Sequence, residues 1–174
     1  MSRFLFLSVF FLFLSNSVNA ADVRVSVTGN IKNESCIINI NDTNQTITLG
    51  DFHIRDFPQA GSTTAGKPLN IRLTDCTETI SGASVTFTGT ASAQYPELLA
   101  VSDTGNGTLL AGGIAIEILD GENEKPIALN ILTRLKPIIR GENTLKYLLR
   151  YKSINNTVTA GDASAIMYFD IIYQ

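Results

Sequence analysis

The stretch AIMYFDIIYQ, residues 165–174, alternates between two faces. One face is apolar throughout and consists of Ala165, Met167, Phe169, Ile171 and Tyr173. The other face is interrupted by the charge of Asp170. A two-residue period of this kind predicts a β-strand. A strand with so apolar a face needs a core beneath it and a paired strand along each edge, which raises the question of which strand covers its second edge.

Short alternating segments of the same kind run through the rest of the chain. They cover residues 22–31, 36–40, 45–50, 67–76, 83–90, 113–119, 127–132 and 143–153, and Gly, Asn and Asp separate them. No stretch of ten or more residues follows the 3.6-residue period of an amphipathic helix. Regularly spaced short strands favour an all-β domain, and a sandwich of two sheets in particular.

The first twenty residues have the pattern of a secretory signal peptide. Arg3 precedes an apolar run from Phe4 to Leu14, and Val18-Asn19-Ala20 supplies small residues at a cleavage site. As a helix, the eleven-residue run would reach only about 16 Å, roughly half of a bilayer core. An uncleaved anchor is the alternative. We therefore expect export and cleavage after Ala20, leaving 174 − 20 = 154 residues, the length of one ordinary domain.

Charge and cysteine content narrow the classes of function. The chain has 13 basic and 16 acidic side chains, and loss of Arg3 leaves 12 against 16, a net charge of −4. It has no run of Lys or Arg, so we expect no nucleic-acid partner. In an exported chain, the pair Cys36 and Cys76 predicts one disulfide. A metal or redox pair is disfavoured, because the chain has one histidine and no C-x-x-C motif.

Catalytic and ligand-binding motifs are absent from the sequence. His53 is the only histidine, so no other imidazole base is available to a catalytic triad. The acidic segment DGENE, residues 120–124, is too short for a twelve-residue calcium loop and is typical of a hairpin turn. No phosphate-binding G-x-x-x-x-G-K-S/T motif occurs. We therefore expect no enzymatic activity, no cofactor, no metal and no small-molecule substrate.

The alternating segment 22–31 carries a glycine on its apolar face. The residues of that face are Val23, Val25, Val27, Gly29 and Ile31. A glycine inside such a face marks either a bulge in an edge strand or a place where another group approaches closely. The residues alone leave both interpretations open.

The order of these features resembles the subunits of fimbriae that are assembled by the chaperone–usher pathway. A signal peptide is followed by an alternating arm with a glycine, a cysteine, and a second cysteine 40 residues later. Gly161 is fourteenth from the end and Tyr173 is penultimate. The segments GNIKNESC, VTFTGTA, LLAV and VTAGDASAIMYFDIIYQ are similar to single-domain subunits of type 1 fimbriae, especially the minor, tip-adaptor subunits.

The resemblance implies an all-β, incomplete immunoglobulin-like sandwich that lacks its last strand and is completed by a strand donated from another chain. It divides the chain into a signal peptide (1–20), a donor-strand extension (21–34) and a pilin domain (35–174). The donor face would be Val23, Val25, Val27, Gly29 and Ile31. The acceptor groove, which also binds the chaperone, would involve Gly161, Ala165, Met167, Phe169, Ile171, Tyr173 and Gln174. The Cys36–Cys76 bridge would join the first and third strands.

The implied function is that of a structural subunit of an extracellular fimbrium. Its partners would be a periplasmic chaperone, an outer-membrane usher and neighbouring subunits. A tip adaptor is the expected role, with a rod subunit or a terminator at the usher as alternatives. A monomeric secreted immunoglobulin-like binding domain, completed by its own N-terminal strand, is the alternative from a different class. Ile172 departs from the family pattern, because polar residues are frequent at that position.

Overall fold

The computed structural model describes residues 35–105 and 107–174. Both the expected signal peptide and the donor face from Val23 to Ile31 lie outside the described residues. The described part is a β-sandwich with two single-turn 3₁₀-helices, η1 (Ile40–Asp42) and η2 (Ile54–Asp56). None of its helices is long and apolar enough to cross a membrane.

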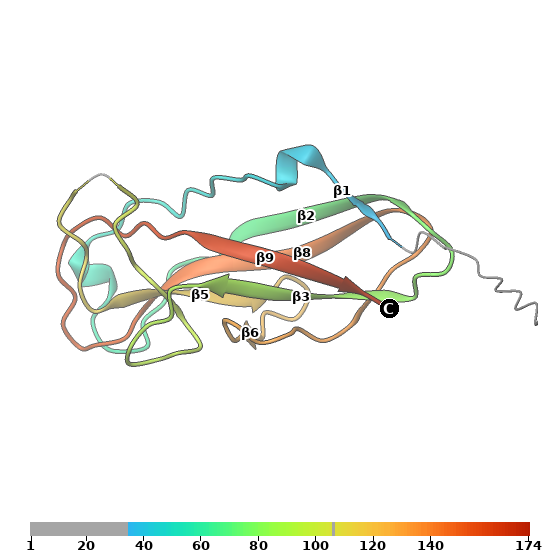
Figure 1. Cartoon of the computed structure of the whole chain (residues 1–174). Helices are drawn as coiled ribbons and strands as arrows, with labels where there is room; N and C mark the ends of the chain where they lie inside the picture. Colours follow the sequence, from blue (N-terminus) through green and yellow to red (C-terminus); the bar gives the residue numbers. More distant parts are fainter. Residues whose placement is uncertain (1–34, 106) are drawn as a thin grey trace, which may run out of the picture. The chain divides into compact units, whose positions relative to one another are not determined.

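Two antiparallel sheets form the sandwich (Figure 1). The first sheet has the order β1 (Ile37–Ile38), β2 (Lys67–Cys76), β8 (Gly141–Ser153), β5 (Ile114–Asp120) and β4 (Leu99–Ala100), and β6 (Pro126–Ile127) also pairs with β5. The second sheet has the order β7 (Lys136–Pro137), β3 (Gly82–Gly89) and β9 (Met167–Tyr173). The all-β sandwich expected from the strand pattern is confirmed.

The core lies between the sheets and is built by the alternation seen in the sequence. Its buried side chains include Leu69, Ile71 and Leu73 of β2, Leu145, Tyr147 and Leu149 of β8, and Val85 and Phe87 of β3. The rings of Phe87 and Tyr147 meet edge to face across the two sheets, with centroids 4.8 Å apart. Such an edge-to-face pair adds to the stabilisation from burial of the two rings.

Two predicted strands differ from the structure. Residues 45–50 are extended but belong to neither sheet. In 127–132 only the first residue is in a strand, because Asn130 adopts a left-handed conformation (φ 61°) and turns the chain. Ile131 beyond this turn is exposed.

The Cys36–Cys76 disulfide is present, but the strands that it joins differ from the expectation. Cys36 immediately precedes β1 and Cys76 ends β2, and these two strands are neighbours in one sheet. The expectation of a bridge between the first and third strands was wrong, because residues 45–50 do not pair as a second strand.

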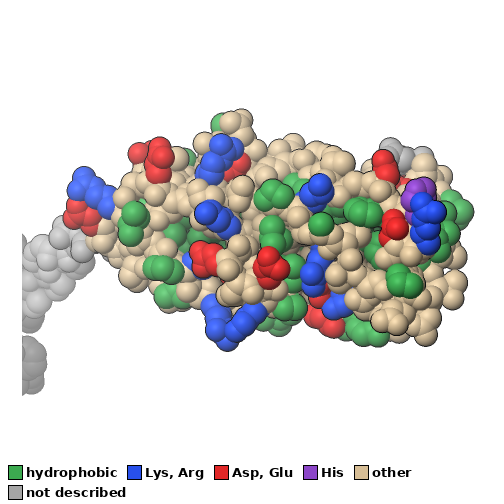
Figure 2. Space-filling model, turned by 180° about the vertical axis from the view of Figure 1, so that it is seen from behind, with side chains coloured by type: hydrophobic (Ala, Val, Ile, Leu, Met, Phe, Trp, Pro, Cys, Tyr) green, Lys and Arg blue, Asp and Glu red, His purple; other side chains and the backbone are tan. Residues whose placement is uncertain are grey.

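Charges are mixed on the face of the molecule seen from behind in Figure 2. Basic and acidic side chains alternate over it, and no large area of one sign appears. The described residues also contain no group of three or more His, Cys, Asp or Glu side chains placed to hold a metal ion.

Candidate functional site: an open groove beside the last strand

The last strand, β9, is paired along one edge only. It pairs with β3 from Gly89↔Met167 to Ala83↔Tyr173. Just beyond the strand, Gly82 and Gln174 exchange both backbone hydrogen bonds, at 2.9 and 3.0 Å. In an antiparallel ladder, alternate residues bond to the same neighbour, so the even-numbered residues of β9 bond to β3. The N–H and C=O groups of Met167, Phe169, Ile171 and Tyr173 therefore point to the other edge, where the described residues supply no strand.

Incomplete pairing is reflected in the burial of β9. Its inward residues Met167, Phe169, Ile171 and Tyr173 are only half-buried, although they pack against the core. The inward residues Val85 and Phe87 of the neighbouring strand β3 are fully buried. The missing neighbour of β9 thus leaves apolar surface as well as backbone groups uncovered.

Residues 46–52 form the opposite rim of the groove. Ile47 and Leu49 turn inward, whereas Thr46 and Thr48 are exposed, which is the alternation of a strand. Among the described residues, no backbone hydrogen bond involves residues 46–52. This rim therefore has the conformation of a β-strand, but its backbone has no hydrogen-bonded neighbour among the described residues.

An ion pair between the buried carboxylate of Asp42 and the half-exposed side chain of Arg72 attaches the start of this rim to the first sheet. The Oδ2 atom of Asp42 accepts hydrogen bonds from the backbone N–H (2.7 Å) and Nε (3.0 Å) of Arg72, and its Oδ1 atom accepts one from Nη2 (2.7 Å). Gln45 donates its side-chain N–H to the carbonyl of Asn70, also on β2. The hydrogen bonds from Arg72 lower the pKa of Asp42 although the carboxylate is buried.

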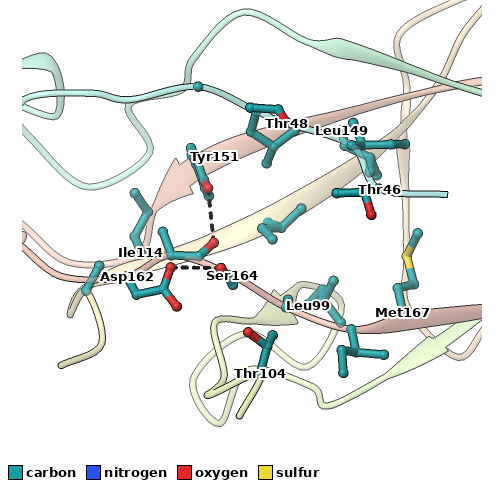
Figure 3. A pocket seen from close by; sticks show the side chains of 18 of the residues that line it. Thr46, Thr48, Leu99, Thr104, Ile114, Leu149, Tyr151, Asp162, Ser164 and Met167 are labelled. Carbon is teal, nitrogen blue, oxygen red and sulfur yellow. Dashed lines mark hydrogen bonds between the residues drawn. The ribbon is translucent and has the colours of Figure 1, made fainter. Parts of the chain in front are cut away.

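Between the rims lies an elongated cavity of about 1640 Å³ (Figure 3). Leu69, Leu99, Ile116, Leu149 and Tyr151 are among the residues that line it. Figure 3 shows Thr46, Thr48 and Leu149 along one side, and Ser164, Leu99 and Met167 along the other. Pockets for small ligands usually measure roughly 300–1,000 Å³, so this cavity is larger than a small-molecule site requires.

Aromatic rings and a close backbone contact shape one end of the groove. Phe52 lies edge to face with Tyr151, at a centroid distance of 5.9 Å, and the Tyr151 hydroxyl donates to the carbonyl of Ala163 at 3.0 Å. A Cβ on Gly161 would lie 2.3 Å from the carbonyl carbon of Leu110. Only glycine therefore lets this part of the rim contact the neighbouring loop so closely.

Tyr173 lies at the opposite end of β9, beyond the cavity. Its hydroxyl donates to the carbonyl of Cys36 at 3.5 Å, and burial raises its pKa. The site is thus an apolar channel between two strands with unsatisfied backbone groups, and it holds no cluster of catalytic groups.

Comparison with known proteins identifies the family. The model of the fimbrial protein family matches residues 25–174. The chain belongs to this family. It is therefore a structural fimbrial subunit rather than an enzyme, and it is exported to the fimbrium on the cell surface.

Relatives of this fimbrial subunit extend over almost the whole chain. It is 40% identical over 169 residues to the fimbrial-like protein YcbU of Escherichia coli K12, covering 95% of this chain and 94% of that protein. It is 36% identical over 149 residues to the type 1 fimbrial subunit of Salmonella typhimurium, covering 84% and 80% of the two chains. The family expected from the sequence is confirmed.

Solved structures support the fold. A type I fimbria protein of Burkholderia pseudomallei superimposes with a TM-score of 0.62 at 32% identity, over 79% of this chain and 88% of that one. The P pilus rod subunit PapA gives a TM-score of 0.66 at 22% identity, over 80% and 99%. The fimbrial subunit thus has the incomplete immunoglobulin-like sandwich of pilus subunits.

The structure brings part of the predicted groove together. Gly161, Ala165, Met167 and Phe169 line the cavity. Ile171 and Tyr173 lie on the same face of β9 beyond the cavity, and Gln174 pairs with Gly82.

Neither the role of residues 46–52 as the opposite rim nor the Asp42–Arg72 pair that attaches this rim was predicted from the sequence of the fimbrial subunit. The alternation in QTITLG indicated a strand there. Nothing in the sequence indicated that this strand faces β9 across a cavity.

Proposed function

We propose that this fimbrial subunit polymerises by donor-strand exchange in a chaperone–usher fimbrium, accepting the N-terminal arm of a neighbouring subunit in its groove. The observation that carries the proposal is the pair of strand-like rims, residues 46–52 and β9, which face each other across an apolar cavity without backbone partners. A strand laid between them would pair with both.

The physical basis is strand addition. Main-chain hydrogen bonds to both rims supply affinity, and alternate side chains entering the cavity supply specificity. In the donor, Val23, Val25, Val27, Gly29 and Ile31 form the inserted face. Burial of each of the four branched side chains is worth about 1.5–3 kcal/mol. Gly29 would lie where the groove is shallow, so a larger side chain there would clash.

The direction of the inserted strand follows from the fold. In an immunoglobulin-like sandwich the last strand runs antiparallel to the strand before it, which here is β9. Ile31 of the donor would then lie near the start of β9, beside Gly161, and Val23 would lie near Tyr173. The corresponding division of the chain is a signal peptide (1–20), an arm (21–34) and a domain (35–174).

An empty groove needs protection before assembly. Exposed apolar surface beside an unpaired strand edge is a template for aggregation. We therefore propose that a periplasmic chaperone and an outer-membrane usher bind the subunit before assembly. The same residues would bind the chaperone first and the neighbouring subunit afterwards. They are Gly161, Ala165, Met167, Phe169, Ile171, Tyr173 and Gln174.

Within the fimbrium we propose the role of a minor, tip-adaptor subunit, on the similarity of the segments GNIKNESC, VTFTGTA and LLAV. A rod subunit is the second candidate, because relatives include a type-1 fimbrial A chain at 33% identity and a probable major fimbrial subunit at 30% identity. Immunolabelling of purified fimbriae tests the choice. Labelling confined to tips supports the adaptor, and labelling along the shaft supports the rod.

Peptide binding tests donor-strand exchange itself. A synthetic peptide of residues 21–32 is titrated into the mature chain whose own arm is disabled by Val25→Asp and Val27→Asp. We expect saturable binding and a raised melting temperature, because a ligand of the folded state stabilises it. A peptide with Gly29→Leu is the matched control and should bind at least tenfold more weakly. A stable monomer that binds neither peptide would instead support a self-contained binding domain.

A further inference from the structure

Two exposed apolar surfaces lie at opposite ends of the domain. The first, here called the mouth surface, consists of Phe52, Ile54 and Leu109, which are 41%, 50% and 82% exposed. Leu109 adjoins the groove, because its carbonyl accepts the N–H of Asp162 at 2.7 Å and Asp162 lines the cavity. Phe52 and Ile54 line the groove themselves. Large apolar side chains exposed beside a binding groove indicate a contact surface.

The second, here called the root surface, surrounds the point where the arm leaves the domain. It consists of Ile37 and Ile139, which are 58% and 70% exposed. Ile37 follows Cys36 directly, and Ile139 follows Ile138, whose N–H bonds the carbonyl of Ser81. Ser81 in turn bonds Gln174, so the root surface lies at the end of β9 opposite the mouth surface (Figure 1).

The length of the arm brings the two surfaces together in neighbouring copies. If the donor strand runs antiparallel to β9, its Ile31 lies at the mouth end of the acceptor. Only residues 32–35 separate Ile31 from Cys36 of the donor domain. An extended chain advances at most about 3.6 Å per residue, so Cys36 lies within about 18 Å of Ile31. The short link therefore holds the root surface of the donor close to the mouth end of the acceptor.

We propose that the mouth surface is a docking site for the root surface of a second copy of this chain, and that Leu109, its most exposed side chain, takes part in the contact. The inference rests on the proposed donor-strand exchange, taken between two copies of this chain, which is the arrangement of the second candidate role, a rod subunit. Once the arm is inserted, the contact between the two domains forms within one complex, so even a weak apolar contact is populated. It slows dissociation and restricts rotation of one domain against the other.

The test uses a defined pair of full mature chains. The acceptor has its own arm disabled by Val25→Asp and Val27→Asp, and the groove of the donor is filled with the peptide of residues 21–32. The dissociation rate of the pair is measured with Leu109→Ser in the acceptor, Ile139→Ser in the donor, or both. Leu132→Ser in the acceptor is the control, because Leu132 is 45% exposed and pairs beside β3, outside both surfaces.

We expect each single variant to dissociate roughly tenfold faster and the double variant to dissociate no faster than either, because both changes remove one shared contact. The control should match the unmodified pair. A Leu109→Ser pair that dissociates like the control, or fully additive effects, would overturn the docking site. Binding of the peptide alone separates the two proposals. If the peptide fails to bind the unmodified groove, donor-strand exchange is wrong, whereas peptide binding without an effect of Leu109→Ser removes only the docking site.

Discussion

Tyr173 and Cys36 are 137 positions apart in the chain, and the hydroxyl of Tyr173 donates to the carbonyl oxygen of Cys36 over 3.5 Å. This contact joins the end of β9 to the first residues of the domain, at the cysteine that forms the disulfide. The contact lies beyond the cavity, which is open between two unpaired rims.

Replacement of Tyr173 separates the effect of the hydroxyl from that of the ring. Tyr173→Phe should lower the free energy of unfolding by less than about 1 kcal/mol, since one long hydrogen bond is lost. Tyr173→Ala should lower it by about 2 kcal/mol, because the half-buried ring packs against the core. Urea denaturation of the mature chain measures both. Equal losses for the two variants would contradict the role given to the ring.

The Cys36–Cys76 disulfide makes a separate contribution to the free energy of unfolding. It closes a loop with a sequence separation of 40, which the chain-entropy estimate values at about 4 kcal/mol. The double variant Cys36→Ala and Cys76→Ala should lose about this amount in urea denaturation. Reduction of the unmodified chain is the control and should give a similar loss. A loss below about 1 kcal/mol would show that the loop is already constrained in the unfolded state.

Most strands were predictable because the two-residue alternation of apolar and polar side chains can be read from neighbouring residues alone. The alternation in 67–76 and 83–90 reproduces β2 and β3 to within one residue at each end. In 127–132 the apolar residues suggested a strand, but the turn at Asn130 depends on a left-handed backbone that the pattern does not reveal. For 45–50 the period was right, yet no local signal shows that the described residues supply this segment with no pairing partner.

The long-range features of the groove were not predictable from spacing. Gly161 was singled out only through the family resemblance, and its contact with the backbone of Leu110 depends on two loops that meet in space. The buried charges Asp42 and Glu117 look like surface residues in the sequence. Their partners, Arg72 for the first and Arg150 and Lys152 for the second, become neighbours only through strand pairing.

Glu117 should make the stability depend on pH. Its carboxylate is buried, which by itself would raise its pKa, but hydrogen bonds from Lys152 (2.6 Å) and Arg150 (2.7 Å) lower the pKa overall. A carboxylate with a lowered folded-state pKa stabilises the fold above its unfolded value, near 4.3, and this stabilisation is lost as the pH falls through the folded value.

Glu117→Gln should therefore destabilise the chain at pH 7 by about 2–3 kcal/mol, because it leaves two cations without their anion. The difference from the unmodified chain should shrink below about pH 4, as Glu117 itself becomes protonated. Urea denaturation at pH 7 and pH 3.5 tests this. Glu78→Gln is the control, because Glu78 pairs with Arg140 at the surface, where both side chains are largely exposed and such pairs contribute little. A gap that stays constant with pH would contradict the role of the charge.

Asp42→Ala should weaken binding of a peptide in the groove more than it lowers the stability of the core. Asp42→Ala removes the bonds that hold the start of the 46–52 rim to Arg72, while the sheets remain intact. We expect affinity for the donor peptide to fall about tenfold, because ordering the rim then costs about 1–2 kcal/mol more on binding. Titration of the peptide measures it. Arg140→Ala, which breaks the exposed pair with Glu78, should leave the affinity unchanged, and an equal effect of both variants would contradict an anchoring role.

Substitution of Gly161 by alanine tests the close backbone contact at the mouth of the groove. An alanine Cβ there would lie 2.3 Å from the carbonyl carbon of Leu110, 2.4 Å from the N of Ala111 and 2.6 Å from the carbonyl oxygen of Leu109. These are backbone atoms, so the two loops must separate, at a cost of about 1–3 kcal/mol.

Because Gly161 also lines the cavity, Gly161→Ala should both lower the urea midpoint and weaken binding of the donor peptide. Gly66→Ala is the matched control, since its Cβ would meet only the side chain of Leu148, at 3.2 Å. That side chain is able to give way, so the control should cost less and leave peptide binding unchanged. If Gly161→Ala behaves like Gly66→Ala in both measurements, the mouth of the groove does not depend on this contact.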